Sequence, residues 1–240
     1  MKLDILAIAA HPDDIEMCCG ATIAKEVSRG KKVGIVDLTR GDLGTRGTAD
    51  TRDEEAANAT KILKLAVREN LRFRDGFFKN NEEHQLEVIK KIRKFKPEIV
   101  ITNAVTDRHP DHGKGSKLVS DACFLSGLRK IETALDGKPQ EAWRPKLILH
   151  TIQWNIAEPD VVVDVTGFMD TKIESCLAYK TQFYNEASPD SEPAIVISGK
   201  QFLESLKYRS YDLGRIIGVQ YAEGFTVERF VAVDSISDLI

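Results

Sequence analysis

The chain has 240 residues, of which 42% are hydrophobic and 30% charged, and its net charge is −3. This length allows one substantial core, and the small negative charge gives no support to nucleic-acid binding. No signal peptide is visible, no apolar stretch is long enough to span a membrane, and the four cysteines lack a C-x-x-C spacing. We therefore expect a cytoplasmic protein with reduced thiols.

Apolar periodicity predicts strands and helices that alternate along the chain. The segment 3–10 is almost entirely apolar, as expected of a strand buried on both faces of a parallel sheet. Gly30 is placed to end the first helix, and Pro97 to end a later one. In chain order we predict a strand at 3–10, a helix at 15–29, a strand at 32–38, a helix at 50–65, a strand at 70–73, a helix at 82–96, a strand at 98–102, a helix at 114–135, strands at 146–152 and 159–165, helices at 169–183 and 202–213, and a strand at 230–233.

This alternation is typical of βαβ units with right-handed crossovers. We expect residues 1–240 to form a single domain with a Rossmann-like α/β fold, in which helices cover both faces of a mostly parallel sheet. Longer loops are predicted at 39–48, 136–145 and 185–193. The phosphate-binding pattern G-x-G-x-x-G is absent after the first strand, which argues against a nucleotide-binding regulator.

Two similar clusters of histidine and aspartate follow predicted strands. Residues 11–14 read His-Pro-Asp-Asp and residues 108–112 read Arg-His-Pro-Asp-His, and together they hold three of the five histidines. In open α/β sheets, ligands bind outside the carboxyl ends of the strands, at a switch point in strand order. We therefore expect the two loops to meet. One such histidine alone is usually a polar loop residue, and one aspartate alone is often a helix N-cap, but two matching clusters favour a metal site.

His11, Asp14 and His112 are the predicted ligands of one Zn²⁺ ion per chain. A catalytic zinc typically takes three ligands from His, Asp or Glu and leaves one position for water. The i, i+3 spacing places His11 at the end of a strand and Asp14 in the first turn of a helix, where Pro12 is also well suited. Because such sites discriminate poorly between metals by affinity, iron, cobalt and manganese are alternatives to zinc.

Three more polar residues of the clusters are available for catalysis. Asp13 is the candidate base that takes a proton from a water activated by the metal. His109, as an imidazolium, could stabilise an oxyanion or protonate a leaving amine. Asp111 could hold His109 in a charged or oriented state. These residues predict hydrolysis that depends on a metal.

The two clusters, together with Glu16, resemble the signature motifs of the zinc-dependent N-acetylglucosaminyl deacetylases of the PIG-L/LmbE family. The resemblance extends to residues 41–47, to Arg52 with 54–56, and to 217–225. It implies the ligands, the base and the oxyanion-stabilising histidine named above, and a contact between Arg52 and the substrate. The last segment and the size most resemble the bacillithiol-biosynthesis branch. That branch converts N-acetylglucosaminyl-malate into glucosaminyl-malate and acetate.

Charge offers some independent support for such a substrate. Malate brings two carboxylates, which Arg46, Arg52 and Arg108 could clamp from the loops that carry the motifs. The partner implied is therefore a small N-acetylated amino sugar, with no nucleic acid and no membrane. The family resemblance also implies a homo-oligomer, with a hexamer as one candidate.

One position departs from the family pattern. Some members place a tyrosine over the active site, and this chain has Phe202 where we would align it. Either Tyr184, Tyr208 or Tyr211 takes the part of that hydroxyl, or the metal and His109 suffice.

Two other functions compete with this prediction. The same chemistry could act on another amide, such as an acetylated chitooligosaccharide or a thiol–sugar conjugate. A protein that binds a metal or a sugar without turnover is a third reading. The presence of Asp13 and of every predicted ligand argues against this last reading.

Overall fold

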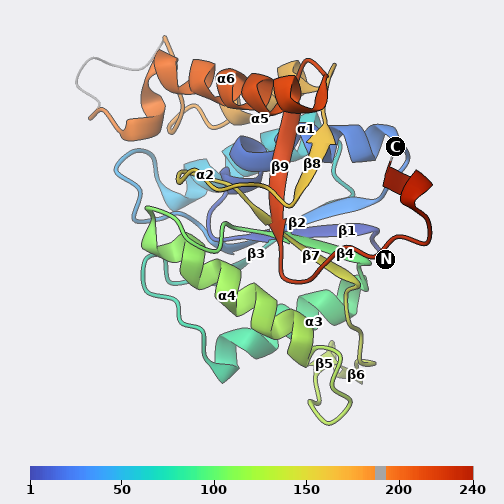
Figure 1. Cartoon of the computed structure of the whole chain (residues 1–240). Coiled ribbons are helices and arrows are strands. Elements are labelled where there is room, and N and C mark those ends of the chain that lie inside the picture. The colour runs from blue at the N-terminus through green and yellow to red at the C-terminus, as the bar shows by residue number, and fades with distance from the viewer. Residues whose placement is uncertain (187–192, 240) are drawn as a thin grey trace.

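The computed structural model describes residues 1–186 and 193–239. Most of the loop predicted at 185–193, namely residues 187–192, therefore lies outside the described residues. A seven-stranded sheet runs through the middle of the molecule, and helices pack on both of its faces (Figure 1). This arrangement confirms the predicted α/β fold with a mostly parallel sheet.

The sheet has the strand order β3-β2-β1-β4-β7-β9-β8. Its strands are β1 (Ile5–Ala9), β2 (Val33–Thr39), β3 (Val67–Phe73), β4 (Ile99–Thr102), β7 (Leu147–Thr151), β8 (Val161–Asp164) and β9 (Ala222–Val227). The first five strands of that order pair in parallel, whereas β9 is antiparallel to both of its neighbours. The chain adds β2 on one side of β1 and β4 on the other, so the switch point lies between β1 and β4.

Six helices form the two outer layers of the described chain. They are α1 (Asp14–Ser28), α2 (Ala49–Ile62), α3 (Glu82–Phe95), α4 (Pro110–Leu125), α5 (Met169–Leu177) and α6 (Lys200–Ile217), with short 3-10 turns η1 (Val196–Ser198) and η2 (Ile236–Leu239). Figure 1 shows α3 and α4 on one face of the sheet and α1, α2, α5 and α6 on the other. Within the described residues, no helix is long and apolar enough to cross a membrane.

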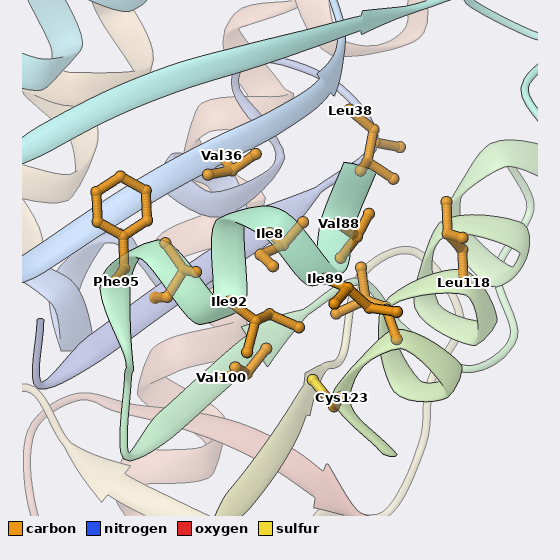
Figure 2. Packing of buried hydrophobic residues seen from close by; sticks show 14 of the residues in the cluster. Ile8, Val36, Leu38, Val88, Ile89, Ile92, Phe95, Val100, Leu118 and Cys123 are labelled. Carbon is orange, nitrogen blue, oxygen red and sulfur yellow. The ribbon is translucent and has the colours of Figure 1, made fainter. Parts of the chain in front are cut away.

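Side chains that alternate along the buried strands divide the core into two layers. Leu6 and Ile8 of β1 belong to the cluster under α3 and α4, whereas Ile5 and Ala7 belong to the cluster under α1. Figure 2 shows the first cluster, in which the sheet residues Ile8, Val36, Leu38 and Val100 meet Val88, Ile89, Ile92 and Phe95 of α3 and Leu118 and Cys123 of α4. Each fully buried Leu or Ile contributes about 1.5–3 kcal/mol. The core thus holds the central strands, and the loops that follow them, in fixed positions.

The helix predicted at 114–135 begins and ends earlier than expected. It begins at Pro110, because His109 acts as its N-cap and proline suits the first turn. It ends at Leu125, and the chain then forms a small hairpin of β5 (Ala134–Leu135) and β6 (Lys138–Pro139). The turn of this hairpin is Asp136-Gly137, with φ of 51° and 74°, the Asp-Gly turn that matches the twist of paired strands.

The strand predicted at 230–233 is wrong. The last strand is β9, which covers 222–227, and residues 228–238 are exposed. Segment 222–227 contains a buried glutamate, Glu223, and a glycine, which mask its strand pattern. It becomes a strand because it pairs antiparallel with both β7 and β8, a long-range interaction that local pattern does not reveal.

Candidate metal centre

The two predicted loops lie side by side at the carboxyl ends of β1 and β4. Asp14 begins α1 shortly after β1, and His109 is the N-cap of α4, where its Nδ1 accepts from the backbone N–H of Asp111. The ring centroids of His11 and His109 are 4.8 Å apart, and those of His11 and His112 are 5.5 Å apart. The expectation that the two clusters meet is therefore confirmed.

The carboxylate of Asp14 lies at the centre of this group. Its Oδ2 is 3.5 Å from Nδ1 of His11, and its Oδ1 is 3.2 Å from Nε2 of His112. Asn103 donates to Oδ2 at 3.0 Å, and Gln153 donates to Oδ1 at 2.6 Å. Burial alone would raise the pKa of Asp14, but the two histidines hold it well below its usual range. The side chain is thus a fixed, ionised carboxylate between two imidazoles.

A second carboxylate lies behind each imidazole. Nε2 of His11 is 3.0 Å from Asp75, and Nδ1 of His112 is 3.0 Å from Asp107. If each ring donates a proton to its aspartate, the other nitrogen presents a lone pair toward Asp14. Without a cation, burial opposes the charged form of His112, yet Asp14 and Asp107 raise its pKa to about 9. Two oriented imidazoles and one carboxylate are a donor set that fits Zn²⁺.

Ligand atoms of the described residues gather closely enough for a metal ion in two sets. His11, His109 and His112 form one set, and His11, Asp75 and Asp111 form the other, with the atoms of each set within 4.8 Å of one another. His11 belongs to both sets, His112 to one, and the predicted ligand Asp14 to neither. Because a tetrahedral catalytic site uses only three protein ligands, the centre offers more donors than one ion needs. The surplus groups are available to assist the reaction.

Asp13 occupies a strained backbone position next to this centre. It is the N-cap of α1 with φ of 106°, a region that residues other than glycine rarely adopt. Its side chain is buried, and Arg52 donates both to its Oδ2 at 3.2 Å and to the carbonyl oxygen of Pro12 at 2.5 Å. Burial raises the pKa of Asp13 to about 7, although the charge of Arg52 acts in the opposite direction. Such a carboxyl can gain and lose a proton near neutral pH.

His109 and Asp111 have different partners from those the sequence suggested. Burial and the neighbouring imidazoles lower the pKa of His109, and because its Nδ1 accepts from a backbone N–H, the neutral ring carries its proton on Nε2. The carboxylate of Asp111 lies 3.4 Å from Nε2 of His11. It also accepts from the backbone N–H of Gly76 at 2.8 Å and from Lys114 at 2.6 Å. Asp111 therefore contacts the His109 ring through its backbone N–H and not through its carboxylate, and the ring also stacks on His112.

Four supporting residues were missed by the sequence analysis: Asn103, Asp75, Asp107 and Gln153. Each follows the carboxyl end of a strand, β4 for Asn103 and Asp107, β3 for Asp75 and β7 for Gln153. Their common signal is a polar residue placed after a parallel strand. That signal is weak, because many loop residues share it, and only the order of the strands shows which ones converge.

A cavity of about 880 Å³ opens in front of the centre. Arg52, which is buried, and Arg108, which is exposed, both line it, whereas Arg46 is not among the described lining residues. The loop at Gly41 packs directly on Arg52. The φ of Gly41 is 64°, and a Cβ atom on Gly41 would lie 3.0 Å from the Arg52 guanidinium. Glycine at this position therefore lets the loop cover the Arg52 side chain.

Aromatic side chains form the far wall of the cavity. The guanidinium of Arg108 lies 4.7 Å from the ring centroid of Trp154, which stacks on Phe202 at 6.3 Å. Tyr208 is 69% exposed and Tyr211 is 56% exposed. Neither of them, nor Tyr184, is among the described residues that line the cavity. No tyrosine of this described wall thus replaces the hydroxyl absent at Phe202.

The chain is similar in sequence to a known family and to named deacetylases. Residues 6–123 match the PIG-L family model, described as GlcNAc-PI de-N-acetylase. The chain is 38% identical over 114 residues to the uncharacterized deacetylase YaiS of Escherichia coli, an alignment that covers 45% of this chain and 61% of YaiS, less than two thirds of that protein. It is 27% identical over 245 residues to the diacetylchitobiose deacetylase of Thermococcus kodakarensis, covering 95% of this chain and 82% of the relative.

A solved structure extends the similarity over the whole fold. The conserved protein TT1542 of Thermus thermophilus superposes with a TM-score of 0.84 and 34% identity, covering 97% of this chain and 98% of the other. The segment matched by the family model contains both loops of the metal centre and the strands that position them. The chain therefore belongs to the PIG-L family and is an amide hydrolase of the deacetylase type.

Proposed function

We propose that residues 1–240 act as one zinc-dependent deacetylase domain that removes the acetyl group from an N-acetylglucosaminide. The observation that carries this proposal is the contact of Asp14 with both His11 and His112, beside a second, buried carboxyl, Asp13, with a pKa of about 7. One carboxylate is suited to hold a cation and the other to transfer a proton. This division of roles is what amide hydrolysis requires.

The proposed mechanism assigns a step to each side chain. Zinc held by His11, Asp14 and His112 would polarise the acetamide carbonyl and make a water more acidic. Asp13 takes the proton of the attacking water and delivers it to the leaving nitrogen as the C–N bond breaks, which yields acetate and the free amine. His109 donates its Nε2 proton in a hydrogen bond to the developing oxyanion. Asp13 and His109 both lie in the cavity wall.

We further propose N-acetylglucosaminyl-malate as the substrate. Support comes from positive charge beside the centre, since Arg52, Arg108 and Arg209 all line the cavity. Arg52 already contacts Asp13, so Arg108 and Arg209 are the cations better placed for an anionic aglycone. Carboxylates are well matched to the planar guanidinium group.

A second candidate substrate is an N-acetylated chitooligosaccharide. Trp154 and Phe202 form a flat apolar wall in the cavity, a surface on which a second sugar ring could stack. Diacetylchitobiose is also the compound named for the relative from Thermococcus kodakarensis. The two candidates differ in charge, and this difference makes them separable by experiment.

The test compares acetate release from N-acetylglucosaminyl-malate, diacetylchitobiose and free N-acetylglucosamine. Because a hydrogen bond to a charged group contributes about 1.5–3 kcal/mol, we expect the malate conjugate to have a kcat/KM about 10–100-fold higher than the neutral sugars. Arg108→Ala should remove much of this advantage and lower diacetylchitobiose turnover far less, because there it alters only the contact with Trp154, with Arg129→Ala as a surface control. Preference for diacetylchitobiose would reject malate, and no acetate from any of the three would reject the proposed function.

A further inference from the structure

Helix α1 is interrupted one turn after the metal centre. Cys19 has φ of −140° and ψ of 24°, which are not helical values, although the helix continues to Ser28. An interruption of this kind leaves carbonyl groups before it and N–H groups after it without partners in the helix. Because Cys19 is fully buried, water does not replace these partners.

A buried ion pair supplies the missing partners. Glu223 of β9 accepts hydrogen bonds from the backbone N–H groups of Ala21 at 3.3 Å and Thr22 at 2.7 Å, and from the Thr22 hydroxyl at 2.6 Å. Lys172 of α5 donates to the carbonyl oxygen of Cys18 at 3.3 Å and to Glu223 at 2.6 Å. The anion thus caps the start of the second helical segment, and the cation contacts the end of the first. These signs match the helix dipole.

Burial makes this ion pair difficult to explain by stability alone. The side chains of Lys172 and Glu223 are 3% and 2% exposed. The free-energy cost of removing two charges from water offsets much of their mutual attraction. A buried ion pair is therefore weak evidence for a stabilising role. Its geometry, by contrast, is specific, because four donors converge on the two oxygens of Glu223.

The first segment of α1 is the part of the helix that carries the catalytic groups. It begins with Asp14, directly after Asp13, and ends at the break. Its other side is held by Glu16, which accepts from Arg68 at 2.5 Å and from Tyr179 at 2.9 Å. The turn is therefore fixed from two sides, by Glu16 within it and by the ion pair at its end. Both α5 and β9 pack against α1 (Figure 1).

We propose that Glu223 and Lys172 are positioning residues that hold the break in α1 and thereby set the position of Asp13 and Asp14 in the metal centre. This inference rests on the proposed function for its catalytic consequence. The proposal also gives a role to segment 217–225, which resembles the family pattern although it lies far from both motifs in the sequence. Glu223 connects that segment to α1.

The test uses Glu223→Gln in the full-length protein. An amide keeps one acceptor oxygen for the two backbone N–H groups and loses the charge, so hydrogen exchange at Ala21 and Thr22, followed by NMR, should become faster. Changes in groups that orient metal ligands typically cost 10–100-fold. We therefore expect zinc affinity, measured by competition with a chromophoric chelator, to fall about 10–100-fold. For the best of the three sugars, kcat should fall with KM within about twofold, as for a group acting on transition-state geometry.

Two further variants separate positioning from general destabilisation. Arg93→Met removes another buried cation, one that donates to the carbonyl oxygens of Ser126 and Leu128 on the opposite face of the sheet. It should lower the melting temperature and leave zinc affinity unchanged. Lys172→Met/Glu223→Gln avoids an unpaired buried charge, and supplies a folded protein if Glu223→Gln does not fold. It should still bind zinc more weakly than the wild type.

Zinc affinity and hydrogen exchange decide the inference independently of the substrate. Wild-type zinc affinity in folded Glu223→Gln or in the double variant would overturn it, as would an equal loss of zinc affinity in Arg93→Met. If the wild type released no acetate from any sugar, the proposed function would fail. The measurements of zinc affinity and of hydrogen exchange would still test the role of Glu223.

Discussion

The nitrogen that each histidine presents to the metal centre is set by an aspartate on the far side of its ring. Asp75 faces Nε2 of His11 and Asp107 faces Nδ1 of His112, each at 3.0 Å. The two rings therefore use opposite nitrogens toward Asp14. Such outer carboxylates fix the tautomer and make the ligand nitrogen more basic, so Asp75 and Asp107 belong to the site as much as the proposed ligands do.

Asp13→Asn tests the proposed base. Asparagine tolerates positive φ better than most residues, so it suits the backbone at 106°. It cannot take a proton from water, and we expect acetate release to fall by about 10²–10⁴-fold. Metal analysis should still find about one zinc per chain, because Asp13 is not a proposed ligand. Turnover close to that of the wild type would remove Asp13 from this role.

Asp107→Asn tests the orientation of His112. The carboxylate accepts from three donors, Nδ1 of His112 and the backbone N–H groups of His109 and Trp154. An amide has one acceptor oxygen and turns an N–H₂ group toward at least one of these donors. We expect zinc affinity to fall about 10–100-fold in a chelator competition.

The matched control for this change is Asp121→Asn on the exposed side of α4. Asp121 pairs with Lys117 and Asn80 at the surface, where ion pairs contribute little. The zinc affinity of the Asp121→Asn variant should equal that of the wild type. If Asp107→Asn also bound zinc normally, the orientation of His112 would have to come from other contacts.

At the scale of whole elements, β9 and α6 complete a site that β1 and β4 begin. β9 lies between β7 and β8 in the sheet, and α6 immediately precedes β9 in the chain. The turn between α6 and β9 therefore places α6 beside the cavity. The turn is tight at Gly214. A Cβ atom there would lie 2.8 Å from the backbone of Val219 and Gln220. Glycine thus permits a close approach on which the position of α6 depends.

Gly214→Ala should therefore loosen this wall of the cavity. Overpacking of this kind typically costs about 1–3 kcal/mol, and the melting temperature should fall accordingly. Because Phe202 and Arg209 lie on α6, KM should rise more than kcat falls. Lys207→Ala on the exposed face of the same helix is the control, and equal behaviour of the two variants would show that the contact at Gly214 is unimportant.

At the scale of the molecule, the sequence predicted the parts of the site that are local. The proposed ligands and the proposed base lie within two short motifs, and the order of strands and helices places both motifs at one edge of a parallel sheet. The antiparallel insertion of β9 was missed, because it depends on pairing between residues about 70 positions apart in sequence. The same holds for the link from Glu223 to α1. The expected homo-oligomer and the bacillithiol-type substrate stay predictions.

Zinc should also stabilise the whole fold. Only the folded chain brings His11, Asp14 and His112 together, so a ligand bound there stabilises the native state by mass action. At free zinc 100 times above its dissociation constant, the gain is about 2.7 kcal/mol. For a chain of this size, that corresponds to a rise of about 5–11 °C in melting temperature. Chelation and dialysis should lower the melting temperature by this amount, and added zinc should restore it. His112→Ala should abolish the zinc-dependent shift, whereas His84→Ala on α3 should retain it, and equal melting temperatures for loaded and stripped wild type would contradict a zinc site in the folded state.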